Sequence, residues 1–219
     1  MPYTSVFDQI STFEWSLAGA VFALVLAVLA FAVFRYRAAA RDHASQETEH
    51  PKVELVYAVL LLLVAIGIVS YTSQVGQRDS AVASSPAVHL QVTGFQWCWR
   101  FSYVGEPVTV TATCQNGHYP TVVLPAREPI HVTTTSGDVI HSFWIPEFRY
   151  KMDSFPHHTN SFDLTIPREG QWLGHCAEFC GLDHATMLFH VKAVSPTAFR
   201  AWLHTRATTA AAATGGPRS

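Results

Sequence analysis

Charged residues are scarce in this sequence: Asp, Glu, Lys and Arg make up 14% of its 219 residues, against about a quarter of an ordinary soluble domain. The formal net charge is only -2, so the chain lacks the basic surface that binding to DNA or RNA requires. A hydrophobic fraction of 49% excludes a disordered chain. We therefore expect a folded protein that has no nucleic-acid partner.

Two long segments lack charge altogether. Residues 15–34 and 55–73 contain no Asp, Glu, Lys or Arg, and each is long enough as a helix to cross a hydrocarbon layer of about 30 Å. The segment before the first run has no Lys or Arg, unlike a cleaved signal peptide, so we expect it to be retained. Residues 1–75 are predicted to form a transmembrane hairpin, and a buried core helix is the alternative for either run.

The positive charges near the two spans indicate the orientation of the hairpin. Arg35, Arg37, Arg41 and Lys52 lie between the spans, whereas only Arg78 follows the second span closely. Because cytoplasmic loops are enriched in Lys and Arg, we expect this loop in the cytoplasm of a bacterium. Both termini and the rest of the chain then lie outside its plasma membrane, where cysteines can be oxidised.

The remainder of the chain is typical of a β domain. Residues 76–87 are small and polar and predict a linker, and turn residues then separate short β-rich runs as far as Val194. An antiparallel sandwich or barrel is the expected architecture. The expected runs are 88–103, 108–113, 121–124, 130–135, 139–144, 160–166, 170–175 and 188–194.

A short helix is expected at the end of this domain. Residues 196–205 begin with Pro196 and carry Phe199, Trp202 and Leu203 on one side. The exported domain is thus predicted to cover residues 88–205. Residues 206–219 are expected to be a flexible tail.

A cluster of metal-binding side chains lies near the end of the domain. Cys176, Cys180, His184 and Met187 form the pattern C-x3-C-x3-H-x2-M, and this combination of soft sulfur and imidazole suits copper. Two thiolates can bridge two copper ions, which then need a second imidazole, and His141 is the candidate. The alternatives are a disulfide between the two cysteines, or a zinc site in which the methionine has no role.

These features together resemble subunit II of the haem-copper cytochrome c oxidases over nearly the whole chain. The resemblance implies a two-helix transmembrane hairpin followed by an all-β cupredoxin-like sandwich or barrel, which carries a dinuclear copper centre called CuA. The thiolates would come from Cys176 and Cys180, the imidazoles from His141 and His184, the thioether from Met187 and a backbone carbonyl from Glu178. The side chain of Glu178 would bind a Mg²⁺ ion shared with subunit I.

The same resemblance implies a role in respiration. Electrons from a c-type cytochrome would enter through Trp97, in the segment GFQWCWRF, and pass from CuA to a haem in subunit I, where O2 is reduced to water. The chain would thus be part of a proton-pumping oxidoreductase. Its partners would be subunits I and III and membrane lipid, and the oxidase could in turn belong to a larger respiratory complex. No C-x-x-C-H pattern for an attached c-type haem is present.

Glu54, in VELVY, would correspond to the family's glutamate at the mouth of a proton channel. Taken by itself, this residue also fits an interfacial charge that the helix dipole favours at a helix N-terminus. Two other functions remain open from the sequence: a membrane-anchored copper-delivery protein, and the matching subunit of a nitric oxide reductase. A copper carrier would require neither Trp97 nor Glu54.

Two further cysteines depart from the family pattern. Cys98 stands between the two tryptophans, where the family usually has an aromatic residue, and Cys114 follows in the next β-rich region. Antiparallel pairing of their runs would bring the two Cα atoms to about 5.5 Å, within range of a disulfide. We expect a disulfide between them, and the alternative is a buried free thiol at Cys98 with an unrelated Cys114.

Overall fold

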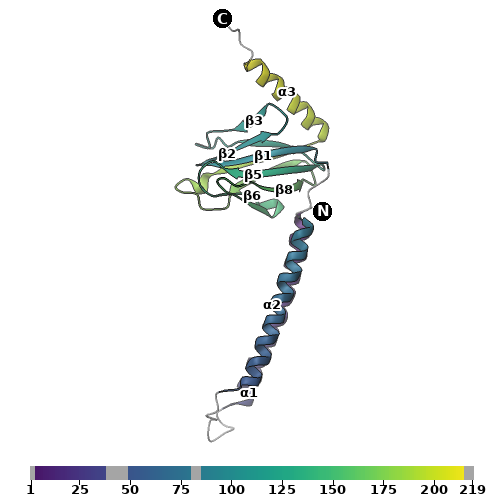
Figure 1. Cartoon of the computed structure of the whole chain (residues 1–219), viewed down its shortest axis with the longest axis vertical. Helices are drawn as coiled ribbons and strands as arrows, with labels where there is room; N and C mark the ends of the chain where they lie inside the picture. Colours follow the sequence, from purple (N-terminus) through teal and green to yellow (C-terminus); the bar gives the residue numbers. More distant parts are fainter. Residues whose placement is uncertain (1–2, 38–48, 80–84, 215–219) are drawn as a thin grey trace. The chain divides into compact units, whose positions relative to one another are not determined.

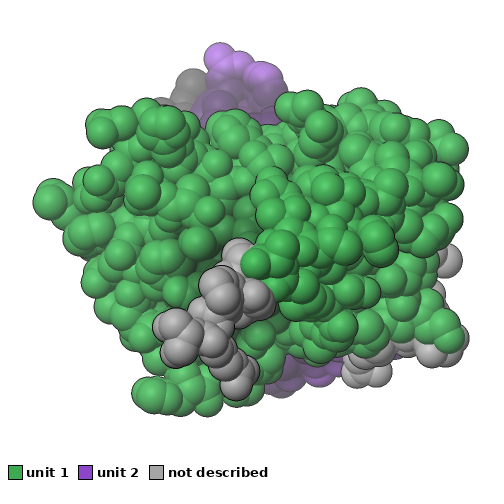
Figure 2. All heavy atoms as spheres, turned by 90° about the horizontal axis from the view of Figure 1, so that it is seen from above, with its two compact units in different colours: residues 1–5, 79–219 green, residues 6–78 purple. Residues whose placement is uncertain are grey.

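The computed structural model describes residues 3–37, 49–79 and 85–214. The chain divides into two compact units: a helical hairpin within residues 6–78, and a β domain within residues 79–219 (Figure 2). Each unit is described by itself.

The hairpin consists of helices α1 (Tyr3–Arg35) and α2 (Pro51–Asp79), both long and apolar enough to cross a membrane. The rings of Phe13 and Tyr71 lie 4.5 Å apart between their centres, so the start of α1 packs beside the end of α2.

The predicted spans are contained in these helices. The linker expected from residue 76 is wrong at its start, since α2 continues to Asp79; a single glycine, Gly76, costs a helix only about 1 kcal/mol. Residues 80–84 of that linker, and Arg41 in the loop, lie outside the described residues.

The β domain contains two five-stranded sheets (Figure 1). The first sheet has the order β3-β2-β1-β5-β8 and the second the order β4-β10-β9-β6-β7. The strands within the described residues are β1 (Val88–Phe95), β2 (Cys98–Tyr103), β3 (Val108–Thr111), β4 (Thr121–Pro125), β5 (Pro129–Ser136), β6 (His141–Ile145), β7 (Tyr150–Ser154), β8 (Asn160–Thr165), β9 (Gly170–Cys176) and β10 (Leu188–Val194).

The pairing of the strands differs from the prediction in one respect. The β1–β5 and β4–β10 pairs are parallel, and the other pairs are antiparallel. A purely antiparallel domain was therefore wrong, because each sheet joins strands that are distant in the sequence. The connections that make such parallel neighbours possible leave no local signal in the residues that they join.

The core lies between the two sheets. In β1 every second side chain is buried, so that Val88, Leu90 and Val92 face inward while His89 and Gln91 face outward. Large aromatic rings fill the interior: Trp99 packs edge-on against Phe189, and the rings of Phe143 and Phe189 stack with their centres 4.8 Å apart. The alternation of buried and outward-facing side chains along β1 is the period-two pattern of a strand with one buried face.

The expected run 88–103 is in fact a tight hairpin. Strand β1 ends at Phe95, residues Gln96 and Trp97 form the turn, and β2 begins at Cys98. Neither turn residue is Gly, Pro, Asn or Asp, the residues that usually mark a turn, so the sequence did not indicate it. The turn places Trp97 at an end of the sheet rather than within a strand.

The last helix, α3, spans Pro196–Thr214. Phe199 is buried against the domain, and Trp202 and Leu203 pack on the same core, as predicted. The flexible tail expected from residue 206 is wrong as far as Thr214, because residues 206–214 are rich in alanine, the strongest helix former, and contain no glycine or proline. Residues 215–219 lie outside the described part of the chain.

One glycine allows a close approach of two strands. Gly174 in β9 lies directly opposite Phe189 in β10, and a Cβ atom at Gly174 would overlap the ring of Phe189. These two strands hold the segment that links Cys176 to Met187, so this contact lies at the base of that loop.

Candidate metal centre

Two neighbouring strands bring the first donors together. His141 is the first residue of β6 and Cys176 is the last residue of β9. The two strands run antiparallel, with Phe143 opposite Cys176. The start of β6 therefore meets the end of β9 at the same end of the sheet. The loop from β9 to β10 then adds Cys180, His184 and Met187.

Backbone hydrogen bonds fix the shape of this loop. The N–H of Cys176 donates to the carbonyl of Met187 over 3.0 Å, and the N–H of Ala177 donates to the carbonyl of Ser142 over 3.0 Å. Within the loop the N–H of His184 donates to the carbonyl of Gly181 over 3.2 Å. The loop therefore returns on itself, and the bond from Ala177 to Ser142 ties its start to β6.

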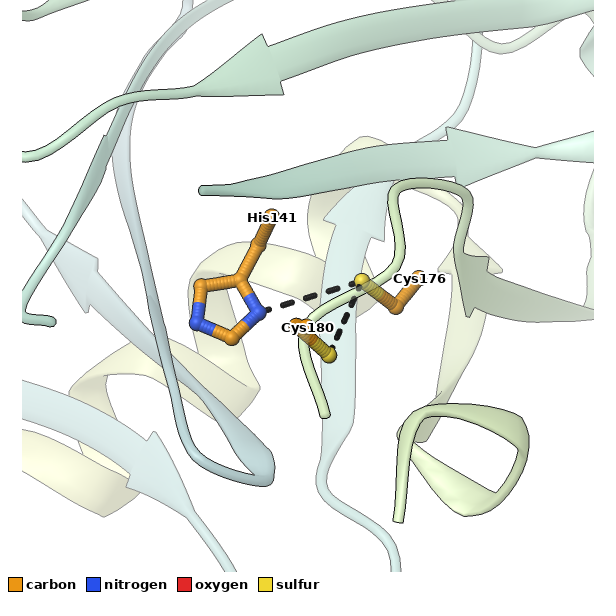
Figure 3. Close-up of side chains that lie close together, drawn as sticks. All are labelled: His141, Cys176 and Cys180. Atoms are coloured by element: carbon orange, nitrogen blue, oxygen red, sulfur yellow. Dashed lines mark hydrogen bonds between the residues drawn. The ribbon is translucent and has the colours of Figure 1, made fainter. Parts of the chain in front are cut away.

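All the donors proposed from the sequence converge on the two sulfur atoms. The Sγ atom of Cys176 lies 3.8 Å from that of Cys180, 3.8 Å from Nδ1 of His141 and 3.3 Å from the carbonyl oxygen of Glu178. The Sγ atom of Cys180 lies 3.6 Å from Nδ1 of His184 and 3.7 Å from Sδ of Met187. Figure 3 shows His141 and the two cysteines, whose donor atoms lie within 4.8 Å of one another.

This geometry fits a shared metal site. The two cysteines are free, and their sulfur atoms are much farther apart than the roughly 2.05 Å of a disulfide. A separation of 3.8 Å still lets both sulfurs reach the same ion, because two thiolate–metal bonds of about 2.3 Å span up to about 4.6 Å. The adjacent thioether favours copper over a tetrahedral zinc site. Cys176, Cys180 and Met187 are buried, so water has little access to the sulfur donors.

The two thiols differ in acidity in the metal-free chain. Burial alone would raise the pKa of the Cys176 thiol, but its hydrogen bond with His141 lowers that pKa to about 6. Burial and the adjacent negative charge of Cys176 raise the pKa of the Cys180 thiol to about 12. The chain therefore presents one thiolate at neutral pH, and the second cysteine must lose its proton when an ion binds.

Asp138 orients a donor imidazole, and sequence reasoning missed it. His141 is fully buried, and its Nε2 lies 2.8 Å from Oδ1 of Asp138. A carboxylate in this position accepts a hydrogen bond from Nε2 and so directs Nδ1 toward Cys176, where Nδ1 can bind a metal ion once it has lost its own proton. The backbone N–H groups of Gln96 and Val139 also donate to this carboxylate. Burial opposes ionisation, but these donors and His141 hold the pKa of Asp138 below its usual value. The spacing of three residues between Asp138 and His141 was the available signal.

Trp97 lies against the same loop. Its indole N–H donates to the carbonyl of Cys180 over 3.0 Å, and the side-chain amide of Gln96 donates to the same oxygen over 2.7 Å. Its ring also borders Gly181, since a Cβ atom there would lie 3.2 Å from the indole. The half-buried indole thus connects the protein surface to the backbone of a sulfur donor. Gln96 was not singled out from the sequence.

The remaining candidate residues take the following places. Cys98 and Cys114 form a disulfide with their Cα atoms 5.4 Å apart, which ties β2 to the segment after β3.

Glu178 contributes its carbonyl near Cys176, and its side chain is half-buried. Glu54 lies in the first turn of α2, where its carboxylate accepts a hydrogen bond from the N–H of His50 over 3.3 Å. This contact is typical of a helix N-terminus.

The fold and the donor set define a class: a cupredoxin-like domain with a candidate metal site, preceded by two apolar helices. Comparison with known proteins identifies the family. Residues 88–194 match the family described as "Cytochrome C oxidase subunit II, periplasmic domain". The "Probable cytochrome c oxidase subunit 2" proteins of Streptomyces avermitilis and Streptomyces coelicolor are 32% and 30% identical, over 85% and 84% of this chain and 70% and 69% of theirs. The chain therefore belongs to the cytochrome c oxidase subunit II family.

Solved structures agree with this assignment. The periplasmic domain of subunit II of the cytochrome oxidase of Bradyrhizobium japonicum aligns with a TM-score of 0.52 and 28% identity, over 57% of this chain and 96% of that domain. A second structure is the mixed disulfide between a thioredoxin-like protein and the same type of subunit, with a TM-score of 0.50 and 26% identity, over 58% and 95% of the two chains. The chain is thus a membrane-anchored subunit of an oxidoreductase family with a role in electron transfer.

Proposed function

We propose that this chain binds two copper ions as a CuA centre, accepts electrons one at a time from a reduced c-type cytochrome, and passes them to a haem of subunit I, where O2 is reduced to water. The observation that carries the proposal is the convergence of two thiols, two imidazoles, a thioether and a carbonyl on one buried position. When bound, the copper pair supplies a carrier for single electrons.

The chain's own residues perform three tasks in this proposal. Cys176 and Cys180 would hold the copper ions by their thiolates, and burial of these sulfurs excludes water. Asp138 holds the His141 ring so that Nδ1 faces the Sγ atom of Cys176. Trp97 provides a route inward, since its indole is bonded to the carbonyl of Cys180.

Further roles follow from the family. We propose that the carboxylate of Glu178 binds a Mg²⁺ ion shared with subunit I, and that Glu54 lies at the mouth of a proton channel of a proton-pumping complex. Subunits I and III and membrane lipid are the proposed surroundings of the hairpin. Arg35, Arg37 and Lys52 flank its loop, which supports a bacterial plasma-membrane location with both termini outside.

Formation of the centre needs reduced cysteines. In an oxidising compartment Cys176 and Cys180 can lose two electrons and two protons and form a disulfide. Since a relative forms a mixed disulfide with a thioredoxin-like protein, we propose that a dithiol protein of this class supplies the two electrons and two protons that restore both thiols before copper binds. The product of that step is the disulfide of the reductant.

The test is copper counting with electron paramagnetic resonance on the full chain purified in detergent. We expect two copper ions per chain and one unpaired electron shared by both. Cys180→Ser should lose this spectrum, whereas His175→Gln should keep it, because His175 is next to Cys176 but packs against Trp144. A single-copper hyperfine pattern in the unmodified chain, or an unchanged spectrum in Cys180→Ser, would reject the dinuclear site.

A second measurement separates an oxidase subunit from a copper-delivery protein. The copper-loaded chain is mixed rapidly with a reduced c-type cytochrome, and oxidation of the cytochrome is followed by absorbance. An oxidase subunit should be reduced by the cytochrome without losing copper. Release of copper to an acceptor protein, with no oxidation of the cytochrome, would favour delivery.

A further inference from the structure

Two histidines lie side by side on the outer face of the first sheet. His89 in β1 is directly opposite His131 in the parallel strand β5, and His131 is directly opposite Asp163 in β8. Their neighbours Leu90, Val132 and Leu164 are buried in the core, so the row of three polar residues lies on the other face of the sheet. His89 is exposed, and 16% of the His131 side chain is accessible.

Asp163 prepares one of these imidazoles for a metal ion. Its Oδ1 lies 2.7 Å from Nδ1 of His131, and an ionised carboxylate can only accept a hydrogen bond. Nδ1 therefore carries the proton, and Nε2 of a neutral ring keeps its lone pair. A carboxylate behind an imidazole is the arrangement that orients histidine ligands at metal sites and increases their basicity.

The spacing of the two rings suits a shared ion. Their centres lie 5.5 Å apart. Two imidazoles bound to one tetrahedral ion through nitrogen–metal bonds of about 2.0–2.1 Å have ring centres about 5 Å apart. The side chain of His89 is exposed and can therefore rotate to close the small difference between these two ring-centre distances. The open side of His89 leaves room for water to complete the coordination.

We propose that His89 and His131 form a second metal site, with Asp163 as its positioning residue, which takes a late first-row divalent cation of the Cu²⁺ and Zn²⁺ class. Imidazole is a favoured ligand of both ions. The site shares no residue with the donor cluster around Cys176 and does not depend on the proposed electron-transfer role. It gives the exported domain a surface position that binds a metal ion reversibly.

Zinc is the probe, because it takes no part in electron transfer. The full chain in detergent is first loaded with only two copper ions per chain, which the tighter cysteine site takes up, then dialysed against micromolar Zn²⁺, and both metals are counted by mass spectrometry. We expect one additional Zn²⁺ per chain with copper content unchanged. His89→Gln and His131→Gln should each remove that ion, and Asp163→Asn should weaken its binding by about 10- to 100-fold. His190→Gln is the matched control, since His190 is an exposed strand histidine of the other sheet.

The outcomes are distinct. Because His89 is exposed, His89→Gln should leave the fold intact, and it therefore decides the matter even if His131→Gln is unstable. Loss of the ion in His89→Gln with retention in His190→Gln supports the site. Absence of the additional Zn²⁺ in the unmodified chain, or equal Zn²⁺ in His89→Gln and the unmodified chain, overturns the proposal.

Discussion

The packing of Gly94 against His141 provides a test of the metal centre that alters none of its donors. A Cβ atom at Gly94 would lie 2.9 Å from both Cγ and Cδ2 of the His141 ring. Carbon atoms in good contact are about 3.5–4.0 Å apart. In Gly94→Ala, β1 and the imidazole must therefore move apart by at least about 0.6 Å. The ring has little freedom, because it is fully buried and bonded to Asp138.

The expected size of the effect follows from this overlap. Overpacking a buried position by one methyl group costs about 1–3 kcal/mol, which should appear as a lower denaturation midpoint of the metal-free chain. Mutation of a residue that positions a metal ligand typically weakens metal binding by about 10- to 100-fold, and Gly94 contacts the His141 ring in such a position. We therefore expect Gly94→Ala to lose copper to a competing chelator at correspondingly lower chelator concentration, and to change the copper absorption spectrum.

Gly137→Ala is the matched control. Gly137 lies next to Gly94, but a Cβ atom there would meet its nearest atoms at 3.8 and 3.9 Å, which is ordinary contact. Chelator competition and absorption spectra of both variants are compared with those of the unmodified chain. If Gly94→Ala binds copper with unchanged affinity and spectrum, His141 is not a donor; an equal loss in Gly137→Ala would show that the effect is not specific to the ring.

Four further variants test other parts of the structure. Trp97→Phe keeps an aromatic ring but loses the hydrogen bond to the Cys180 carbonyl, so we expect slower reduction by cytochrome in stopped-flow measurements with the copper spectrum preserved; equal rates would place the route elsewhere. Replacing both Cys98 and Cys114 by Ala should lower stability in denaturant by roughly 3 kcal/mol, as their separation is 16 residues, and no change would mean that the bond contributes nothing. Tyr103→Phe should cost about 1–3 kcal/mol, because the N–H and carbonyl of Val123 lose their partner. Burial raises the pKa of Tyr103, so stability of the unmodified domain should fall as pH rises above about 10, where the unfolded tyrosine ionises, and Tyr103→Phe should lack that part of the fall. Glu54→Gln should slow proton uptake by the assembled oxidase, and unaltered kinetics would leave Glu54 as an interfacial charge.

The convergence of the candidate donors could be predicted from the sequence because most of them lie close together in it. Cys176, Cys180, His184 and Met187 lie within one short loop, and the need for a second imidazole pointed to His141. Asp138 could not be assigned in the same way, since its role depends on a turn that brings its carboxylate back to the imidazole. The hairpin turn at Trp97 was missed for a related reason: tertiary contacts to the metal loop, rather than typical turn residues, accompany its conformation.

The parallel pairing of β1 with β5 lay beyond prediction as well. Alternating burial indicates which side chains face the core, but it does not say which strand lies beside another. That pairing is also what brings His89 beside His131. The helix α3 was underestimated because the end of the chain was expected to fray from residue 206, whereas the alanines in residues 206–214 carry the helix to Thr214.

The contact between Gly174 and Phe189 has an evolutionary consequence. With a benzyl ring already filling the space above position 174, a mutation there to any larger residue is deleterious unless position 189 becomes smaller at the same time. The two sites should therefore covary among homologous sequences, with their summed side-chain volume nearly constant. A change at one position without the other would alter the distance between β9 and β10 on either side of the loop from Cys176 to Met187. Homologues that keep the candidate donors should therefore change both positions together or neither.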